Sequence, residues 1–134
     1  KHEGSDITLI ATSSMVQVCE KAAEMLEADG ISAEVIDPRT IVPLDMETIL
    51  ASVRKTSRAI VVDEGHQSFG VTAEIASRIN EQAFYHLDAP VQRMGAMDVP
   101  VPFSPALEDI TVPTPEGVAE RARQALNGEL FYAS

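Results

Sequence analysis

The sequence of 134 residues is poor in cysteine, in aromatic residues and in positive charge. Its single cysteine, Cys19, excludes an internal disulfide and any metal centre built from several cysteines. Ten Lys and Arg stand against 21 Asp and Glu, giving a net charge of −11, and no basic cluster occurs. Nucleic acid and anionic membranes attract basic surfaces, so neither is an expected partner, whereas a basic protein is compatible with this charge.

Long apolar runs are also missing. No stretch approaches the ~20 apolar residues that a membrane-spanning helix needs, and the opening residues Lys1 to Gly4 do not resemble a signal peptide. This polar opening without an initiator methionine suggests a piece of a longer protein. The chain length fits one domain with one hydrophobic core.

Short apolar, β-branched runs alternate with amphipathic segments along the chain. This order predicts an α/β fold, a three-layer α/β/α domain with a mostly parallel sheet and right-handed crossovers. We expect strands at residues 7–11, 33–36, 59–63 and 91–94, and helices from residue 15 to Gly30 and over residues 45–55, 71–85 and 115–126.

The predicted helices carry stripes of inward-facing residues. Residues three or four positions apart mark one face of each helix, which should point toward the sheet. The first stripe consists of Val16, Cys19, Ala22, Ala23 and Leu26, and that of the third helix of Ile75, Ile79, Gln82 and Ala83.

Ligands of parallel α/β sheets bind beyond the carboxyl ends of the strands. The candidate positions are therefore Thr12 to Ser14 after the first strand and Glu64 to Gly70 after the third. The second loop contains Gly65 and Gly70 at the spacing of a phosphate cradle. It lacks the lysine that should follow the second glycine, where Val71 stands instead, and Glu64 adds a negative charge, so a nucleotide phosphate is not expected.

His66 is the one weak catalytic candidate. An imidazole beside Glu64 can exchange protons near neutral pH, but no nucleophile is paired with it, and a surface histidine on a connecting loop is the competing interpretation. The three histidines are scattered at spacings that do not suit a metal, so we expect no metal site and no bound cofactor in this chain.

Four stretches together resemble a known family: "EGSDITLIAT", "IDPRTIVPLDMETILASVRKT", "VVDEGHQSFGVTAEIASRI" and "LDAPVQRMGAMDVPVPF". In this order and spacing they are similar to the C-terminal domain of the β subunit of thiamine-diphosphate-dependent 2-oxo acid dehydrogenases. This domain has the transketolase C-terminal fold and occurs in pyruvate, branched-chain 2-oxo acid and acetoin dehydrogenase E1 components. The resemblance extends from Glu3 to about Leu126.

The resemblance implies that the chain consists of three parts and that the cofactor is bound elsewhere in the enzyme. Residues 1–6 would be the linker from a missing N-terminal pyrimidine-binding domain, residues 7–127 the transketolase C-terminal-like domain, and residues 128–134 a tail. An antiparallel edge strand would precede residue 1. Thiamine diphosphate and Mg²⁺ would be held by the α subunit and the missing domain, so this chain alone should be inactive. The compartment would be the bacterial cytoplasm or, in a eukaryote, the mitochondrial matrix, with the cytoplasm preferred.

The implied partners are the E1 α subunit, a second β subunit across a two-fold axis, and the basic peripheral subunit-binding domain of the E2 acyltransferase. Asp88 matches a family position near the E2 surface and is carried over as a docking candidate. Asp98 and Phe103 lie in a segment that matches "DVPxPY", where Phe103 replaces the tyrosine and lacks its hydroxyl. Many family members have no histidine at the position of His66.

The resemblance thus implies the C-terminal assembly domain of an E1 β subunit, which mediates subunit association and E2 docking in an enzyme that oxidatively decarboxylates a 2-oxo acid or cleaves acetoin and transfers the acyl group to E2 lipoamide. Two other interpretations compete with it. In the first, the chain is a stand-alone α/β module that binds a small anion at the end of the sheet where Ser13 and Gly65 lie. The second interpretation is a flavodoxin-like redox domain, and the scarcity of aromatic residues and the absence of a phosphate loop argue against it.

Overall fold

The computed structural model describes residues 3–12, 14–38, 46–62, 69–94 and 113–127. Within these residues the predicted alternation of strands and helices is confirmed. The elements are β1 (Ile7–Ala11), α1 (Met15–Ala28), β2 (Ala33–Ile36), α2 (Met46–Thr56), β3 (Ala59–Val62), α3 (Phe69–Gln82), the 3₁₀ helix η3 (Phe84–His86), β4 (Gln92–Met94) and α5 (Pro115–Leu126).

The described strands form one parallel sheet in the order β2-β1-β3-β4. The central strand β1 pairs with both neighbours, since Leu9 lies opposite Val35 of β2 and opposite Ile60 of β3. All five residues of β1 are buried, as expected for a strand that helices cover on both faces. The strand order reverses direction between β1 and β3, which makes the carboxyl ends of these two strands the switch point of the sheet.

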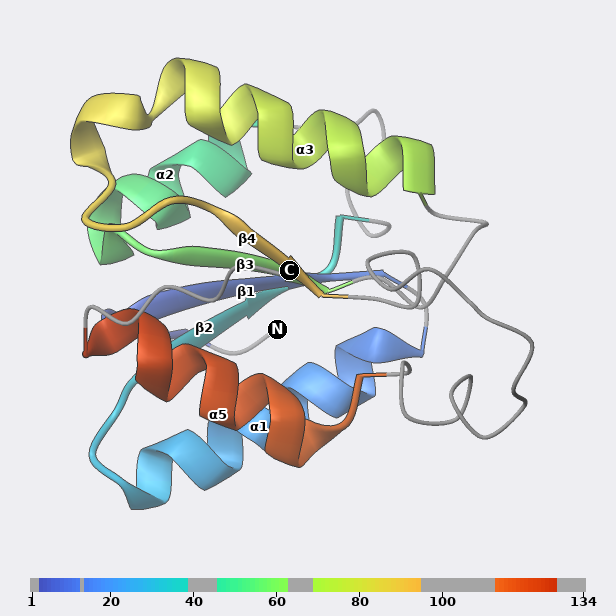
Figure 1. Ribbon diagram of the computed structural model, residues 1–134, viewed down its shortest axis with the longest axis vertical. Coiled ribbons are helices and arrows are strands. Elements are labelled where there is room, and N and C mark those ends of the chain that lie inside the picture. Colours follow the sequence, from blue (N-terminus) through green and yellow to red (C-terminus); the bar gives the residue numbers. More distant parts are fainter. Residues whose placement is uncertain (1–2, 13, 39–45, 63–68, 95–112, 128–134) are drawn as a thin grey trace.

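Helices cover both faces, α1 and α5 on one side and α2 and α3 on the other (Figure 1). Side chains alternate along β1, so Ile7, Leu9 and Ala11 pack under α1 and α5, whereas Ile10 packs under α2 and α3. The stripe predicted for the first helix is confirmed, because all five of its residues are buried. Gly30 adopts φ +79° after α1, the left-handed geometry that ends many helices.

The third predicted helix needs correction. Helix α3 begins at Phe69 and not at Val71, so Gly70 lies in its first turn and not in the preceding loop. A helix can begin at these residues because the N–H groups of its first turn need no intrahelical acceptor. The helix ends at Gln82 because the chain tightens into η3, in which Leu87 N donates to Phe84 O (3.2 Å).

The stripe of this helix was also partly wrong. Gln82 is exposed, and Ala76 is buried together with Ile75, Ile79 and Ala83. At about 100° per residue, Gln82 lies at the edge of the buried face, about 20° beyond Ile75, and its side chain is exposed there.

Candidate functional site

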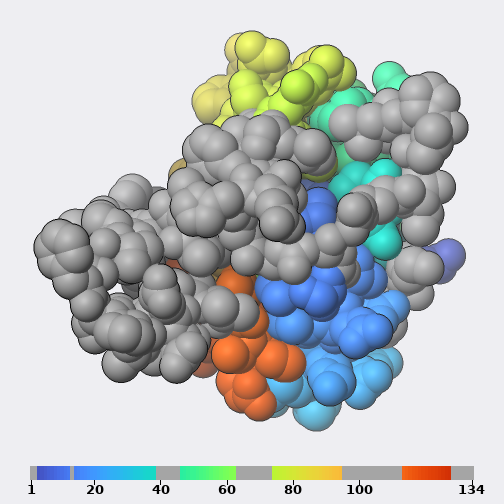
Figure 2. All heavy atoms as spheres, turned by 90° about the vertical axis from the view of Figure 1, so that its right-hand side faces the viewer, coloured from blue at the N-terminus to red at the C-terminus, as the bar shows by residue number. Residues whose placement is uncertain are grey.

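The predicted ligand end of the sheet lies at the carboxyl ends of β1 and β3, the side that faces the viewer in Figure 2. Thr12 directly follows β1 and is buried, and its hydroxyl has no hydrogen-bond partner among the described residues. Its carbonyl accepts from Met15 N (3.0 Å) at the start of α1. Of the predicted site residues at this end, Ser13, Glu64, Gly65 and His66 lie outside the described residues. Their role at a ligand site stays a prediction.

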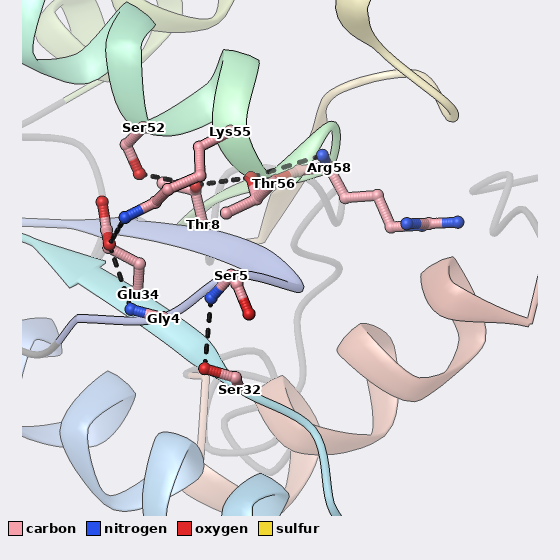
Figure 3. A network of polar contacts seen from close by, with 9 residues as sticks. All are labelled: Gly4, Ser5, Thr8, Ser32, Glu34, Ser52, Lys55, Thr56 and Arg58. Carbon is pink, nitrogen blue, oxygen red and sulfur yellow. Dashed lines mark hydrogen bonds and ion pairs between the residues drawn. The ribbon is translucent and has the colours of Figure 1, made fainter.

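A polar network that the sequence analysis did not predict lies at the opposite, amino end of the sheet (Figure 3). Thr8 of β1 is fully buried, and its hydroxyl oxygen lies 2.8 Å from Ser52 Oγ and 2.7 Å from Thr56 Oγ1 of α2. Thr56 Oγ1 also donates to Arg58 O (3.0 Å). The hydroxyls satisfy one another, which removes most of the cost of placing polar groups in a core.

Glu34 of β2 extends this network toward the start of the chain. Its Oε1 accepts from Lys55 Nζ at 2.7 Å and from Gly4 N at 3.0 Å, and its side chain is 12% exposed. Burial by itself raises the pKa of Glu34, but hydrogen bonds from Lys55, Ser52 and Gly4, with the charge of Lys55, outweigh it and lower the pKa below its ordinary value. Glu34 is therefore a carboxylate at neutral pH.

The docking candidate Asp88 lies on the surface between η3 and β4. Its N–H donates to Ser57 O (2.8 Å), and Ser57 has a left-handed φ of 66°, so this contact fastens the turn before β3 to the turn before β4. One Asp88 carboxylate oxygen is 3.7 Å from Arg58 Nη1, and the side chain remains 61% exposed. The carboxylate is thus oriented by a loose ion pair and is accessible to a second cation.

Two aromatic rings are exposed close to Asp88 in the sequence. Phe84 is 62% and Tyr85 is 95% exposed, and their rings meet edge to face with centroids 5.4 Å apart. Large apolar side chains with this exposure are typical of surfaces that bind partners. The other two docking candidates, Asp98 and Phe103, lie outside the described residues.

Cys19 lies in the core and does not contribute to a surface site. Its side chain is fully buried, and burial, followed by the charge of Glu20, raises the pKa of its thiol to about 12. The thiolate required of a nucleophile or metal ligand is therefore suppressed at neutral pH.

No group of three or more His, Cys, Asp or Glu among the described residues is arranged to hold a metal ion. A search of the same residues finds no helix with the length and apolar character needed to cross a membrane. An open cavity of about 230 Å³ lies beside the end of α1 and is lined by Glu3, Glu27, Gly30, Ile31 and Ser32. Its two carboxylates do not suit the small anion of the alternative interpretation.

The network around Glu34 left only faint signals in the sequence. Thr8 interrupts an otherwise apolar strand, and Glu34 is the one charged residue of β2. Neither signal identifies a partner, because the residues that contact Thr8 and Glu34 lie 18 to 48 positions away in the chain.

Comparison with known proteins gives consistent results. Residues 1–118 match the family model "Transketolase, C-terminal domain". The chain is 50% identical over all of its 134 residues to the mitochondrial pyruvate dehydrogenase E1 component subunit beta of Pisum sativum. It is 48% identical over 94% of its length to the corresponding subunit of Bacillus subtilis.

The chain spans 37% of the pea subunit and 38% of the Bacillus subunit. Among solved structures it is similar to "Split gene transketolase, inactive beta4 tetramer", with a TM-score of 0.76 and 29% identity. That alignment covers 94% of this chain and 41% of the other. The α/β fold is thus shared with a transketolase C-terminal type of domain.

Proposed function

The chain belongs to the transketolase C-terminal domain family, and on that premise we propose that it is the C-terminal assembly domain of an E1 β subunit. The observation that carries the proposal is an identity of 45–50% to pyruvate dehydrogenase E1 β subunits over at least 93% of this chain. The parent enzyme would decarboxylate a 2-oxo acid oxidatively and transfer the acyl group to the lipoamide of E2. The names of the relatives favour pyruvate over branched-chain 2-oxo acids and acetoin.

The chemistry of this enzyme would take place on parts other than this chain. Thiamine diphosphate supplies the carbanion-stabilising chemistry when bound, and in this proposal the α subunit and the preceding pyrimidine-binding domain hold it together with Mg²⁺. The described residues contain no ligand set for a divalent metal, and we assign no reaction step to them. This chain contributes binding surfaces, and by itself it would not turn over substrate.

The partners proposed are the α subunit, a second β subunit and the basic docking domain of E2. The segment that contains Asp88 supports the last of these, because it carries an exposed carboxylate and, three and four residues earlier in the chain, the exposed rings of Tyr85 and Phe84. The overall charge of −11 adds an attractive field for a basic partner.

Activity is tested on the full-length β subunit that contains this domain, coexpressed with its α subunit. We expect turnover of pyruvate in an assay that also offers branched-chain 2-oxo acids and acetoin, and no turnover by residues 1–134 alone. The proposal would be contradicted if the assembled subunits turned over none of these three kinds of substrate.

Docking is tested with Asp88→Asn in the same assembled E1, titrated with the isolated E2 docking domain. Loss of a charge contact at the interface should weaken binding by about tenfold. Glu24→Gln, an exposed acid on α1, is the matched control that removes the same charge elsewhere. Equal affinities of the two variants would exclude Asp88 as a docking residue.

The competing proposal, a stand-alone module that binds a small anion, rests on the buried Thr12 hydroxyl at the switch point of the sheet. It predicts that residues 1–134 bind inorganic phosphate or pyruvate as a monomer. Calorimetry with both anions and sedimentation of the isolated chain separate the alternatives, since the assembly proposal expects weak self-association and no anion affinity. The compartment proposed is the bacterial cytoplasm or the mitochondrial matrix, because the similar proteins include bacterial and mitochondrial ones.

A further inference from the structure

The segment that leads into β1 is fastened to the amino end of β2. Three consecutive backbone N–H groups donate to residues at the amino end of β2: Gly4 to Glu34 Oε1 (3.0 Å), Ser5 to Ser32 Oγ (3.1 Å) and Asp6 to Ser32 O (2.7 Å). The contact is reciprocal, since Ser32 N donates to Asp6 Oδ2 (2.7 Å). A merely flexible linker has no need for this set of contacts.

Gly4 lies closer to β2 than any other residue type permits. A Cβ atom added to it would lie 2.3 Å from Ala33 C, 2.5 Å from Ala33 O and 2.7 Å from Glu34 N. These are backbone atoms of a paired strand, which cannot yield as a flexible side chain does. Any side chain at position 4 must therefore push the segment away from β2.

Glu34 connects the same segment to the helix layer. Its Oε1 accepts from Lys55 of α2 as well as from Gly4, and Ser52 of α2, also bound to Glu34, reaches the buried hydroxyl of Thr8 (Figure 3). The acceptor that holds the entering chain is thus itself held by the core. Its low pKa keeps it charged, so the contact persists throughout the neutral range.

We infer that the amino end of β2 is an intramolecular docking site, formed by Ser32 and Glu34 and requiring glycine at position 4. It fixes the direction in which the preceding polypeptide enters the domain. The orienting role rests on the proposed function, because it needs a longer β subunit with a domain before this one. A junction held in one geometry lowers the entropy lost when subunits assemble.

The docking itself is tested on residues 1–134 by amide hydrogen exchange. In Gly4→Ala we expect residues 4–6 to exchange about tenfold faster relative to the central amides of β1 and β3, as after loss of a hydrogen bond. Gly30→Ala is the matched control: Gly30 has φ +79° with nothing within 4 Å of an added Cβ, so its strain is local to the end of α1. Unchanged relative exchange in Gly4→Ala would overturn the inference.

A second pair of variants keeps the test decisive if Gly4→Ala does not fold. Glu34→Ala removes the acceptor of Gly4 and should release the Gly4 amide selectively. Lys21→Met, which changes an exposed lysine on α1, should leave the exchange of Gly4 unchanged. Release of residues 4–6 only together with global unfolding in Glu34→Ala would contradict a specific docking site.

The orienting role is tested in the full-length β subunit with spin labels on this domain and on the preceding one. We expect Gly4→Ala to broaden the distance distribution, and an unchanged distribution would overturn the orienting role. Failure of the proposed function would appear separately, as absent 2-oxo acid turnover by the assembled subunits, and would leave the amide exchange of residues 4–6 unaffected.

Discussion

On one face of the sheet, α1 and α5 bury mainly small residues, among them Ala22, Ala23, Ala119, Ala122 and Ala125. On the other face, α2 and α3 bury larger aliphatic side chains together with the hydroxyls of Thr8, Ser52 and Thr56. Small residues let α1 and α5 approach the sheet closely, and the core cluster of this face consists of apolar side chains. The second face contains a polar network that extends to Gly4, where the chain enters the domain. The first face contributes apolar packing, whereas the second face also positions the chain that enters the domain.

The largest effect on stability is expected when a small buried residue of the first face is replaced by a larger one. Ala122→Leu adds three carbons at a fully buried position of α5 and should lower the free energy of unfolding by about 1–3 kcal/mol. Ala51→Leu, exposed on α2, is the control and should change stability by less than about 0.5 kcal/mol. Denaturant unfolding of both variants measures the difference, and equal effects would mean that the alanine layer tolerates larger side chains.

Removal of one hydroxyl tests the polar network of the second face. Thr8→Val preserves the shape but leaves Thr56 and Ser52 with one partner fewer, so the free energy of unfolding should fall by about 1–2 kcal/mol. Ser52→Ala and the double variant complete a double-mutant cycle, read by denaturant unfolding. Purely additive effects would show that the hydroxyls are not energetically coupled.

Glu34→Gln should have a smaller effect that depends on pH. The native pKa of Glu34 is lowered from 4.5, so its charge stabilises the fold above the unfolded value, and this contribution disappears as pH falls through the native pKa. Because Lys55 is half exposed, the contribution at pH 7 should stay below about 1 kcal/mol. Unfolding curves of both proteins between pH 7 and strongly acidic pH should converge below pH 4.5, and a gap that widens on acidification would reverse the sign of the argument.

Cys19 gives the smallest expected effect. Its thiol is fully buried in the first face with a pKa raised to about 12, so iodoacetamide at neutral pH should not label the folded chain. Mass spectrometry before and after denaturation measures the labelling. Rapid labelling of the native protein would show that the layer of α1 and α5 opens easily.

Sequence periodicity was sufficient for most of the fold. The run Ala33–Ile36 is β2 with the predicted bounds, and the stripe of α1 is buried at every predicted position. The exposed Gln82 shows the limit of this method, since a stripe read from a few residues leaves the rotation of a helix uncertain by about one position. The predicted residues Glu64, Gly65, His66, Asp98 and Phe103 lie outside the described residues, and their roles stay predictions.

The sequence by itself determined the order of strands and helices, the apolar faces and the family resemblance, because these depend on local spacing along the chain. Only the tertiary structure decided that Gly4 meets Glu34, that Glu34 meets Lys55, and that Asp88 joins Ser57. Each of these contacts unites residues that lie 21 to 31 positions apart, and no local pattern encodes which distant partner will come within hydrogen-bond distance.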